Sequence, residues 1–447
     1  MAHERQDVEG KPGDAGARPV GGQSIRRKEV FAWGMYDWAN SAYSTVLITV
    51  VVSYIKDDVF PGTRGTIVYG WGLGGSMLTA AFLSPVLGAI ADANSSKHRW
   101  LIGTALPGAV MCSLMYFATP AHPYLFLALF LLANILFELS FGFYNAFLPE
   151  ISDDSNMGRV SAWGYGLGYV GGGLALAMEI VLLFKGRDWG ISDDITHLKR
   201  LGLLLMGLWW GVFSLPAFFI LRDRAPASRE RQSLVEAART AVLKVAGSIR
   251  GVRKYPVLAL FLLGFLVYND GVQTMISQSS LFAIEVLSMT AGELAMVVLM
   301  IQFIALPGAV LVGYLADRYS HKAALIGCLL IWIALLIGAY FINTKAQFWW
   351  LAALAALVLG GTQSVSRSIM GLMTPADRTA EFFGFFNLSG RMMSPFGPIF
   401  FTSILALTGN ANLAITSLLV FFVFGLLIVA PLNISLGQRQ VRTAEEA

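Results

Sequence analysis

The stretch VGYLADRYSHKAA, residues 312–324, follows a long apolar run and places a glycine four residues before an aspartate. The stretch LGAIADANSSKHR, residues 87–99, has the same pattern after another apolar run in the first half of the chain. Further along, Pro149 and Pro375 are separated by almost the same offset. Matches that recur in order at a nearly constant offset predict a chain built from two related halves.

The repeated stretch also predicts a contact that can hold one conformation and break in another. A glycine allows a second helix to approach closely, and an aspartate at a helix end can cap the next helix or pair with a basic residue on a neighbouring one. A plain turn that carries positive charge is the alternative interpretation. The residues of this predicted lock are Gly88, Asp92, Gly313, Asp317, Arg318 and Lys322.

The composition is that of a membrane protein. Of the 447 residues, 56% are hydrophobic and 13% charged, and the mean hydropathy is +0.63, whereas a soluble domain carries about 25% charged residues. The predicted spans are 30–55, 67–91, 99–119, 124–148, 159–184, 201–221, 257–284, 292–316, 323–343, 347–371, 382–406 and 412–435. Each can cross about 30 Å of hydrocarbon as a helix. We therefore expect an all-α integral membrane protein with twelve transmembrane helices in two six-helix bundles.

Basic residues predict the orientation. With the N-terminus inside, 23 Lys and Arg residues fall in inner segments and 7 in outer ones, which predicts that both termini are cytoplasmic. The same bias accounts for the net charge of +4 without a nucleic-acid partner. The predicted parts are a disordered cytoplasmic tail (1–29), a first bundle (30–221), a basic cytoplasmic linker with an amphipathic helix (222–256), a second bundle (257–435) and a cytoplasmic tail (436–447).

Over about residues 30–435 the chain resembles the major facilitator superfamily: two six-span halves, a basic central loop and the duplicated glycine–aspartate pattern. The first copy has Asp92-Ala93-Asn94 where an Asp-Arg pair is common, while Asp317-Arg318 keeps that pair. Finer stretches resemble the vacuole-effluxer-like permeases related to an autophagy-associated vacuolar protein. These are YDWANSAYST (36–45), GRVSAWGYGLGYVGGGL (158–174), GGTQSVSRSIM (360–370) and AEFFGFFNLSGR (380–391). The resemblance implies export of small solutes, with amino acids the class linked to the fungal members, and it makes spans 1, 4, 7 and 10 the cavity helices.

Polar and charged side chains inside the spans are the candidate site, because each charge costs about 2.5–3.5 kcal/mol to insert. The candidates for substrate binding or gating are Tyr36, Asp37, Asn40, Tyr43, Glu138, Asn269, Asp270, Gln273, Gln363, Arg367, Asn387 and Arg391. On a helical wheel, the polar residues of 36–44 form one stripe, which predicts a cavity wall or, alternatively, a hydrogen-bonded seam between helices. Glu179 is interpreted as an interfacial carboxylate near the outer end of its span.

Opposite charges among these candidates could hold a zwitterion. Its carboxylate would bind Arg391 or Arg367, and its ammonium would bind Asp37 or Asp270. A buried carboxyl group can also carry a proton, since desolvation favours its neutral form. The candidates for proton coupling are Asp37, Glu138 and Asp270.

The leading hypothesis is a secondary transporter for a small polar solute, working by alternating access as a monomer in the lipid bilayer. The five histidines all fall in tails or loops, and neither a metal cluster nor a nucleophile motif is apparent, so we expect no enzyme activity, cofactor or metal. The alternatives are a non-transporting receptor or scaffold and a permease for sugars or peptides. The expected location is the bacterial inner membrane, or a vacuolar or lysosomal-type membrane in a eukaryote.

Overall fold

The protein is helical along nearly all of its described length. The computed structural model describes residues 27–61, 63–224, 255–289, 291–392 and 396–446. The first half contains α1 (Arg27–Val46), α2 (Thr63–Ala93), α3 (Lys97–Leu114), α4 (Pro123–Ala146), α5 (Leu148–Ile151), α6 (Met157–Lys185) and α7 (Ile195–Ile220). The second half contains α9 (Pro256–Leu287), α10 (Ala291–Arg318), α11 (His321–Ala339), α12 (Lys345–Leu372), α13 (Thr379–Met392), α14 (Phe396–Thr408), α15 (Ala411–Ser417), α16 (Leu419–Val429) and α17 (Ile434–Glu446).

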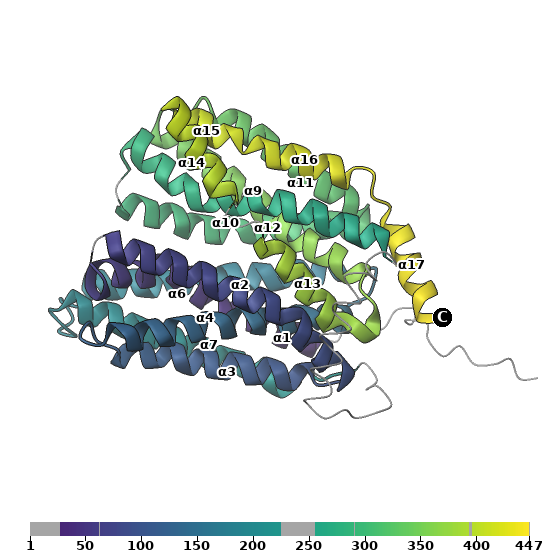
Figure 1. Cartoon of the computed structure of the whole chain (residues 1–447), viewed down its shortest axis with the longest axis horizontal. Coiled ribbons are helices and arrows are strands. Elements are labelled where there is room, and N and C mark those ends of the chain that lie inside the picture. Colours follow the sequence, from purple (N-terminus) through teal and green to yellow (C-terminus); the bar gives the residue numbers. More distant parts are fainter. Residues whose placement is uncertain (1–26, 62, 225–254, 290, 393–395, 447) are drawn as a thin grey trace, which may run out of the picture.

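Helices α1–α7 pack together as one half of the molecule, and α9–α16 form the other (Figure 1). Within the first half α1 packs on α6 and α7, and within the second α10 packs on α12. The halves meet mainly where α6 lies against α10 and where α2 lies against α13. These two contacts are related by the internal repeat, because α2 and α10 carry its two copies.

Eleven of the twelve predicted membrane spans are confirmed. In the described residues, eleven helices are long and apolar enough to cross a membrane. The predicted span 382–406 is covered by α13 and the short apolar helix α14. The predicted amphipathic helix of the linker and most of the N-terminal tail lie outside the described residues.

One end of the bundle, here called the termini side, holds the start of α1 and the C-terminal helix α17 (Figure 1, right). Residues 436–446, predicted only as a tail, belong to α17. The Gln438 side chain donates a hydrogen bond to Asp154 Oδ2 at 3.2 Å, and Arg442 reaches the same oxygen at 3.3 Å. Because Asp154 lies between α5 and α6, α17 joins the second half to the first on this side.

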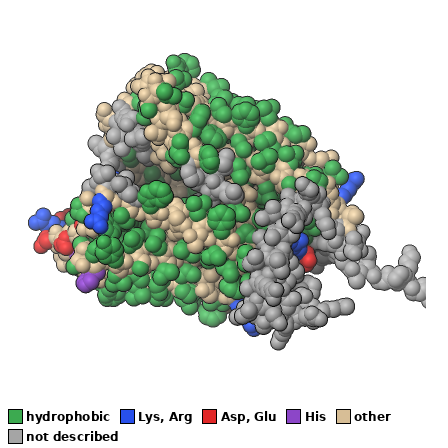
Figure 2. All heavy atoms as spheres, in the orientation of Figure 1, with side chains coloured by type: hydrophobic (Ala, Val, Ile, Leu, Met, Phe, Trp, Pro, Cys, Tyr) green, Lys and Arg blue, Asp and Glu red, His purple; other side chains and the backbone are tan. Residues whose placement is uncertain are grey.

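Side-chain placement matches a lipid environment. Figure 2 shows apolar side chains over most of the visible surface, with charged groups gathered at the two ends. Large apolar side chains such as Trp71 and Leu407 are more than 80% exposed, which is favourable only in an apolar solvent. Interior positions hold Trp33, Trp210 and Trp332, all fully or almost fully buried.

Local sequence explains where several helices begin. Thr344 caps α12 by accepting a hydrogen bond from the Gln347 amide, while the Gln347 side chain accepts one from the Thr344 amide. Ser320 caps α11 and Asp194 caps α7 in the simpler one-way form. Each cap satisfies amide groups that a helix start would otherwise leave without a partner.

Candidate functional site

A buried ion pair joins the two halves near the termini side. Arg367 of α12 lies with its Nη1 atom 3.3 Å from Asp37 Oδ2 of α1. Their side chains are 0% and 3% exposed. Tyr144 of α4 donates a hydrogen bond of 2.8 Å to the same carboxylate oxygen. The two charges that sequence analysis assigned to different cavity helices therefore bind each other in this conformation.

Within the described part of the chain, the other polar contacts of the Arg367 side chain are also with the first half. Its Nε donates to Ser161 Oγ at 3.0 Å and its Nη2 to the Ser161 carbonyl oxygen at 2.6 Å, both on α6. Its Nη1 also donates to Asn145 Oδ1 of α4 at 3.2 Å. The guanidinium carbon lies 3.8 Å from the ring centre of Tyr165, 4.6 Å from that of Trp33 and 5.6 Å from that of Tyr144.

These contacts offset the cost of burying a charge. An unpaired guanidinium would lose its hydration without compensation, whereas here a carboxylate, three further acceptor oxygens and aromatic faces replace the water. Arg suits such a place better than Lys because its planar group can donate in several directions while stacking on rings. The side chain thus ties α12 firmly to the first half.

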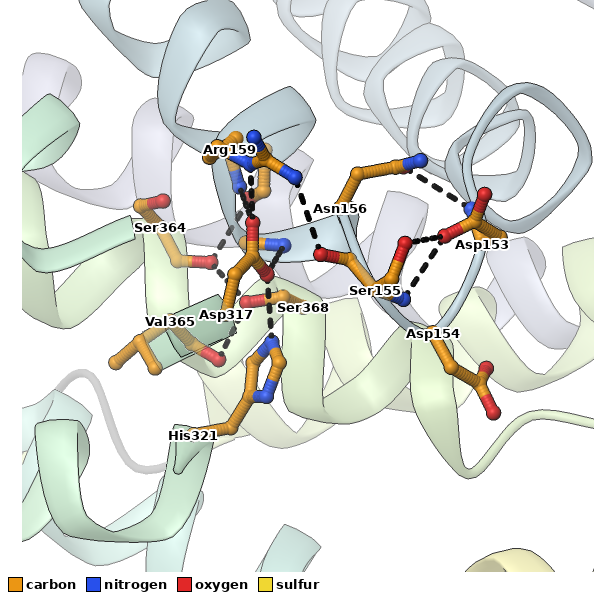
Figure 3. Close-up of polar contacts among 12 residues, drawn as sticks. Asp153, Asp154, Ser155, Asn156, Arg159, Asp317, His321, Ser364, Val365 and Ser368 are labelled. Atoms are coloured by element: carbon orange, nitrogen blue, oxygen red, sulfur yellow. Dashed lines mark hydrogen bonds and ion pairs between the residues drawn. The ribbon is translucent and has the colours of Figure 1, made fainter. Parts of the chain in front are cut away.

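The second copy of the repeated motif forms a helix cap across the halves (Figure 3). Asp317, near the end of α10, accepts hydrogen bonds from the Gly158 amide at 2.8 Å and the Arg159 amide at 2.9 Å. It also pairs with Arg159 Nε at 3.0 Å. Gly158 and Arg159 are in the first turn of α6, where free amides and the helix dipole favour a negative charge.

Close approach of the backbones makes this cap feasible. A Cβ atom on Gly313 would lie 2.6 Å from the Gly158 carbonyl oxygen, and one on Gly158 would lie 2.7 Å from the Gly313 carbonyl oxygen. Neither distance is sterically acceptable, so both positions require glycine in this conformation. Glycine therefore brings α10 close enough for Asp317 to reach the start of α6.

The first copy of the motif makes the mirror contact. Asp92, near the end of α2, accepts hydrogen bonds from the Ala380 amide at 3.1 Å and the Glu381 amide at 2.9 Å, at the start of α13. A Cβ atom on Gly88 would overlap the Ala380 carbonyl oxygen. Lys97 lies 4.0 Å from Asp92, pairs with Glu150 and donates to Thr379 Oγ1 at 2.7 Å.

Each copy of the motif therefore caps a helix in the opposite half of the molecule. The first copy does so although it lacks the arginine of the usual Asp-Arg pair. The two basic residues of the second copy are less involved. Arg318 is exposed, with its guanidinium carbon 5.8 Å from the ring centre of Tyr319. Lys322 is half-buried on α11.

Further hydrogen bonds join the halves deeper in the bundle. Ser161 Oγ donates to the Ser364 carbonyl oxygen at 2.8 Å, and Tyr169 donates to Gln363 Oε1 at 2.5 Å. Gln302 of α10 donates to Thr45 Oγ1 of α1 at 2.8 Å. Thr45 lies about 27 Å along α1 from its start, at 1.5 Å per residue. At the end opposite the termini side, the surface is hollowed between the halves (Figure 2).

The other predicted residues of α1 lie in a seam with α4. Tyr36 is fully buried and donates to Ser140 Oγ at 2.7 Å. Tyr43 is also fully buried and donates to Asn134 Oδ1 at 3.4 Å. Asn40 is 2% exposed. The polar stripe thus forms a helix–helix seam along much of its length, which was the alternative left open by the sequence.

The remaining candidates are spread over α4, α9 and α13. Glu138 and Asp270 are buried, and Gln273 is half-buried. Asn269 donates to the Gly390 carbonyl oxygen at 3.1 Å, while Asn387 Nδ2 lies 3.0 Å from where a Cβ on Gly142 would be. The side chain of Arg391 lies outside the described residues. The contacts described for Asn269 and Asn387 are with groups other than Asp37 and Arg367.

Glu179 lies near the far end of α6 but is not exposed there, as an interfacial carboxylate would be. Its side chain is 0% exposed, and neither carboxylate oxygen has a hydrogen-bond partner in the described part of the chain. A Cβ atom on Gly202 of α7 would overlap it. The carboxyl group is therefore packed between α6 and α7 inside the first half.

Several contact residues were missed by sequence analysis, because aromatic and small polar side chains are common in apolar spans. They are Trp33, Tyr144, Asn145, Ser161 and Tyr165. Ser161 and Tyr165 lie in the stretch 158–174 that carried the family resemblance, which was the only signal pointing to them. A hollow of about 470 Å³ between α2 and α4 has an almost wholly apolar lining and holds none of the cluster.

Comparison with known proteins identifies the family. Residues 66–442 match the model of the family described as vacuole effluxer Atg22 like. The chain belongs to this family. It is 30% identical over 408 residues to the uncharacterized MFS-type transporter YxiO of Bacillus subtilis, covering 90% of this chain and 94% of that protein. It is 25% identical over 327 residues to autophagy-related protein 22 of Kluyveromyces lactis, covering 69% of this chain and 65% of that one.

Solved structures show that this Atg22-like chain has the major facilitator fold. The human organic anion transporter MFSD10 superposes with a TM-score of 0.71 at 13% identity, covering 91% of this chain and all of that one. The transporter FucP, in its outward conformation, gives a TM-score of 0.70 at 15% identity, with coverage of 91% and 98%. With the family match and the similarity to the Bacillus subtilis relative, the protein is a membrane transporter of the major facilitator type.

Proposed function

We propose that this Atg22-like protein is a secondary active transporter that exports a small polar solute, an amino acid or related metabolite, by alternating access with proton coupling. The observation that carries the proposal is the Asp37–Arg367 pair. Two opposite charges from different halves meet inside a largely apolar bundle, at a cost that a static scaffold need not bear. A contact of this kind suits a gate that closes and opens.

The arrangement of the caps supports the same proposal. Asp92 and Asp317 each hold the first turn of a helix from the opposite half, so separating the halves on the termini side breaks both caps together. With both termini cytoplasmic, as the Lys and Arg distribution predicts, the closed side is the cytoplasmic one and the conformation is outward-facing. In a bacterium the protein would then reside in the inner membrane.

The Asp37–Arg367 pair also supports proton coupling. Protonation of Asp37 would remove the charge that attracts Arg367 and so weaken the closed cytoplasmic side. Release of the proton would restore the attraction and favour closure. Glu138 and Asp270 remain further candidates, since both are buried carboxyl groups on predicted cavity helices.

Counterflow in proteoliposomes tests the proposal. Liposomes loaded with one unlabelled amino acid should accumulate the labelled form, and a protonophore should collapse accumulation driven by a pH gradient. Asp37→Asn should reduce net transport at least tenfold, whereas Asp193→Asn, in a highly exposed pair with Arg187, should leave it unchanged. Counterflow of sugars or peptides alone would overturn the amino-acid assignment, and no counterflow of any solute would favour a receptor or scaffold.

A further inference from the structure

The described polar and aromatic partners of the Arg367 side chain all come from the first half of the molecule. They belong to α1, α4 and α6, whereas Arg367 belongs to α12 in the other half. These partners, here called the cage, are Trp33, Asp37, Tyr144, Asn145, Ser161 and Tyr165. Arg367 therefore occupies the cage as a ligand would occupy a site on another molecule.

The chemistry of the cage is that of a cation site. It offers Arg367 a carboxylate, an amide oxygen, a hydroxyl and a backbone carbonyl, all acting as hydrogen-bond acceptors. The faces of Tyr165 and Trp33 lie within 5 Å of the guanidinium carbon, and aromatic faces of this kind attract organic cations. Without Arg367, the Asp37 carboxylate would lose its cationic partner while keeping the hydrogen bond from Tyr144.

Alternating access requires Arg367 to leave. Trp33 lies about 9 Å from the start of α1 and Ser161 about 6 Å from the start of α6, at 1.5 Å per residue, so the cage is near the termini side. When the halves separate there, α12 carries Arg367 away and the cage opens toward the same side. Leaving a buried carboxylate unpaired is costly, and a cation from solution would relieve that cost.

We propose that the open cage binds the guanidinium or primary ammonium group of a small organic cation, so that this group and Arg367 occupy the cage in turn. The inference rests on the proposed alternating access and narrows its solute class to cationic amino acids and amines. Closure then requires Arg367 to displace the cation from the cage. The side chain thus acts as a tethered competitor that drives release of the cationic group into the central path.

Binding to the full-length protein in nanodiscs tests this inference. Arginine, agmatine and ethylguanidinium are the probes, and urea is the uncharged planar control. Wild-type protein should bind arginine or agmatine weakly, because Arg367 competes for the cage. Arg367→Ala should bind ethylguanidinium at least tenfold more tightly than wild-type protein does. Ethylguanidinium should also raise the melting temperature of this variant, whereas urea should not. Arg367→Ala combined with Asp37→Asn should lose this binding.

A matched variant distinguishes the effect of opening the termini side from the effect of removing the Arg367 side chain. Arg159→Ala weakens the Asp317 cap but keeps Arg367 as a competitor for the cage, so it should not gain the tight ethylguanidinium binding of Arg367→Ala. If wild-type protein neither binds nor exchanges any cationic probe, the inference is wrong, even if ethylguanidinium fills the hole in Arg367→Ala. Persistent counterflow of neutral amino acids in that case would leave the proposed transport function standing.

Discussion

Replacement of Asp317 by asparagine should open the termini side. The carboxylate accepts two backbone hydrogen bonds from the first turn of α6 and pairs with Arg159. Asparagine keeps one acceptor oxygen but loses the charge. Hydrogen bonds to charged groups contribute about 1.5–3 kcal/mol each, and a charge at a helix start adds about 0.3–1 kcal/mol. We therefore expect the closed state to lose about 2–3 kcal/mol, which is a 30- to 150-fold shift in population.

Cysteine labelling can measure this shift. Ser364 is 0% exposed where α12 meets α6, so a cysteine there should react with a maleimide only when the halves separate. The natural Cys112 and Cys328 are both buried and should contribute little background. In the Ser364→Cys background, Asp317→Asn should raise the labelling rate by about the population shift, provided that opening and closing are fast compared with labelling.

The control is Asp193→Asn, which removes an exposed charge on the opposite side and should leave the rate unchanged. A monodisperse elution profile at the wild-type volume would show that the Asp317 variant is folded. The reasoning is refuted if folded Asp317→Asn labels within twofold of its parent, or if the control variant accelerates labelling equally.

Three further predictions concern the same structure. Asp92→Asn should raise Ser364→Cys labelling much as Asp317→Asn does, and the double variant should exceed both; equal rates in the single and double variants would show that the caps are not independent. Gly313→Val should favour the open state because a Cβ there would meet α6, and unchanged labelling would contradict the close approach. Glu179→Gln should raise the melting temperature in nanodiscs, since it removes a buried carboxyl group that has no hydrogen-bond partner in the described part of the chain; a fall would show that the carboxyl group is stabilising.

The cage and the caps differ in how they respond to transport. The caps involve backbone amides, which lie at fixed positions on their helices, so they can form in only one relative arrangement of the halves. The cage involves side chains that stay with the first half whatever its partner does. This difference is why the caps fit a simple lock, while the cage can accept another ligand once Arg367 has left.

Much of the architecture followed from the sequence alone. Apolar runs long enough to cross a bilayer predicted the spans, because lipid allows no unsatisfied backbone and so requires helices. The repeated glycine–aspartate pattern predicted close helix approach and a helix cap at each copy, although the capped helices belong to the opposite half rather than following next in the chain. Asp37 and Arg367 stood out as charges in apolar runs.

Tertiary structure alone decided which of these groups meet. The sequence left open which basic residue pairs with Asp37. The packing of α12 against α6 brings Arg367 to it. Trp33, Tyr144 and Tyr165 carry no charge, so nothing in the sequence distinguished them from ordinary buried rings. Contacts across more than 300 residues of chain depend on how two bundles dock, and that geometry is a property of the folded surfaces rather than of any local pattern.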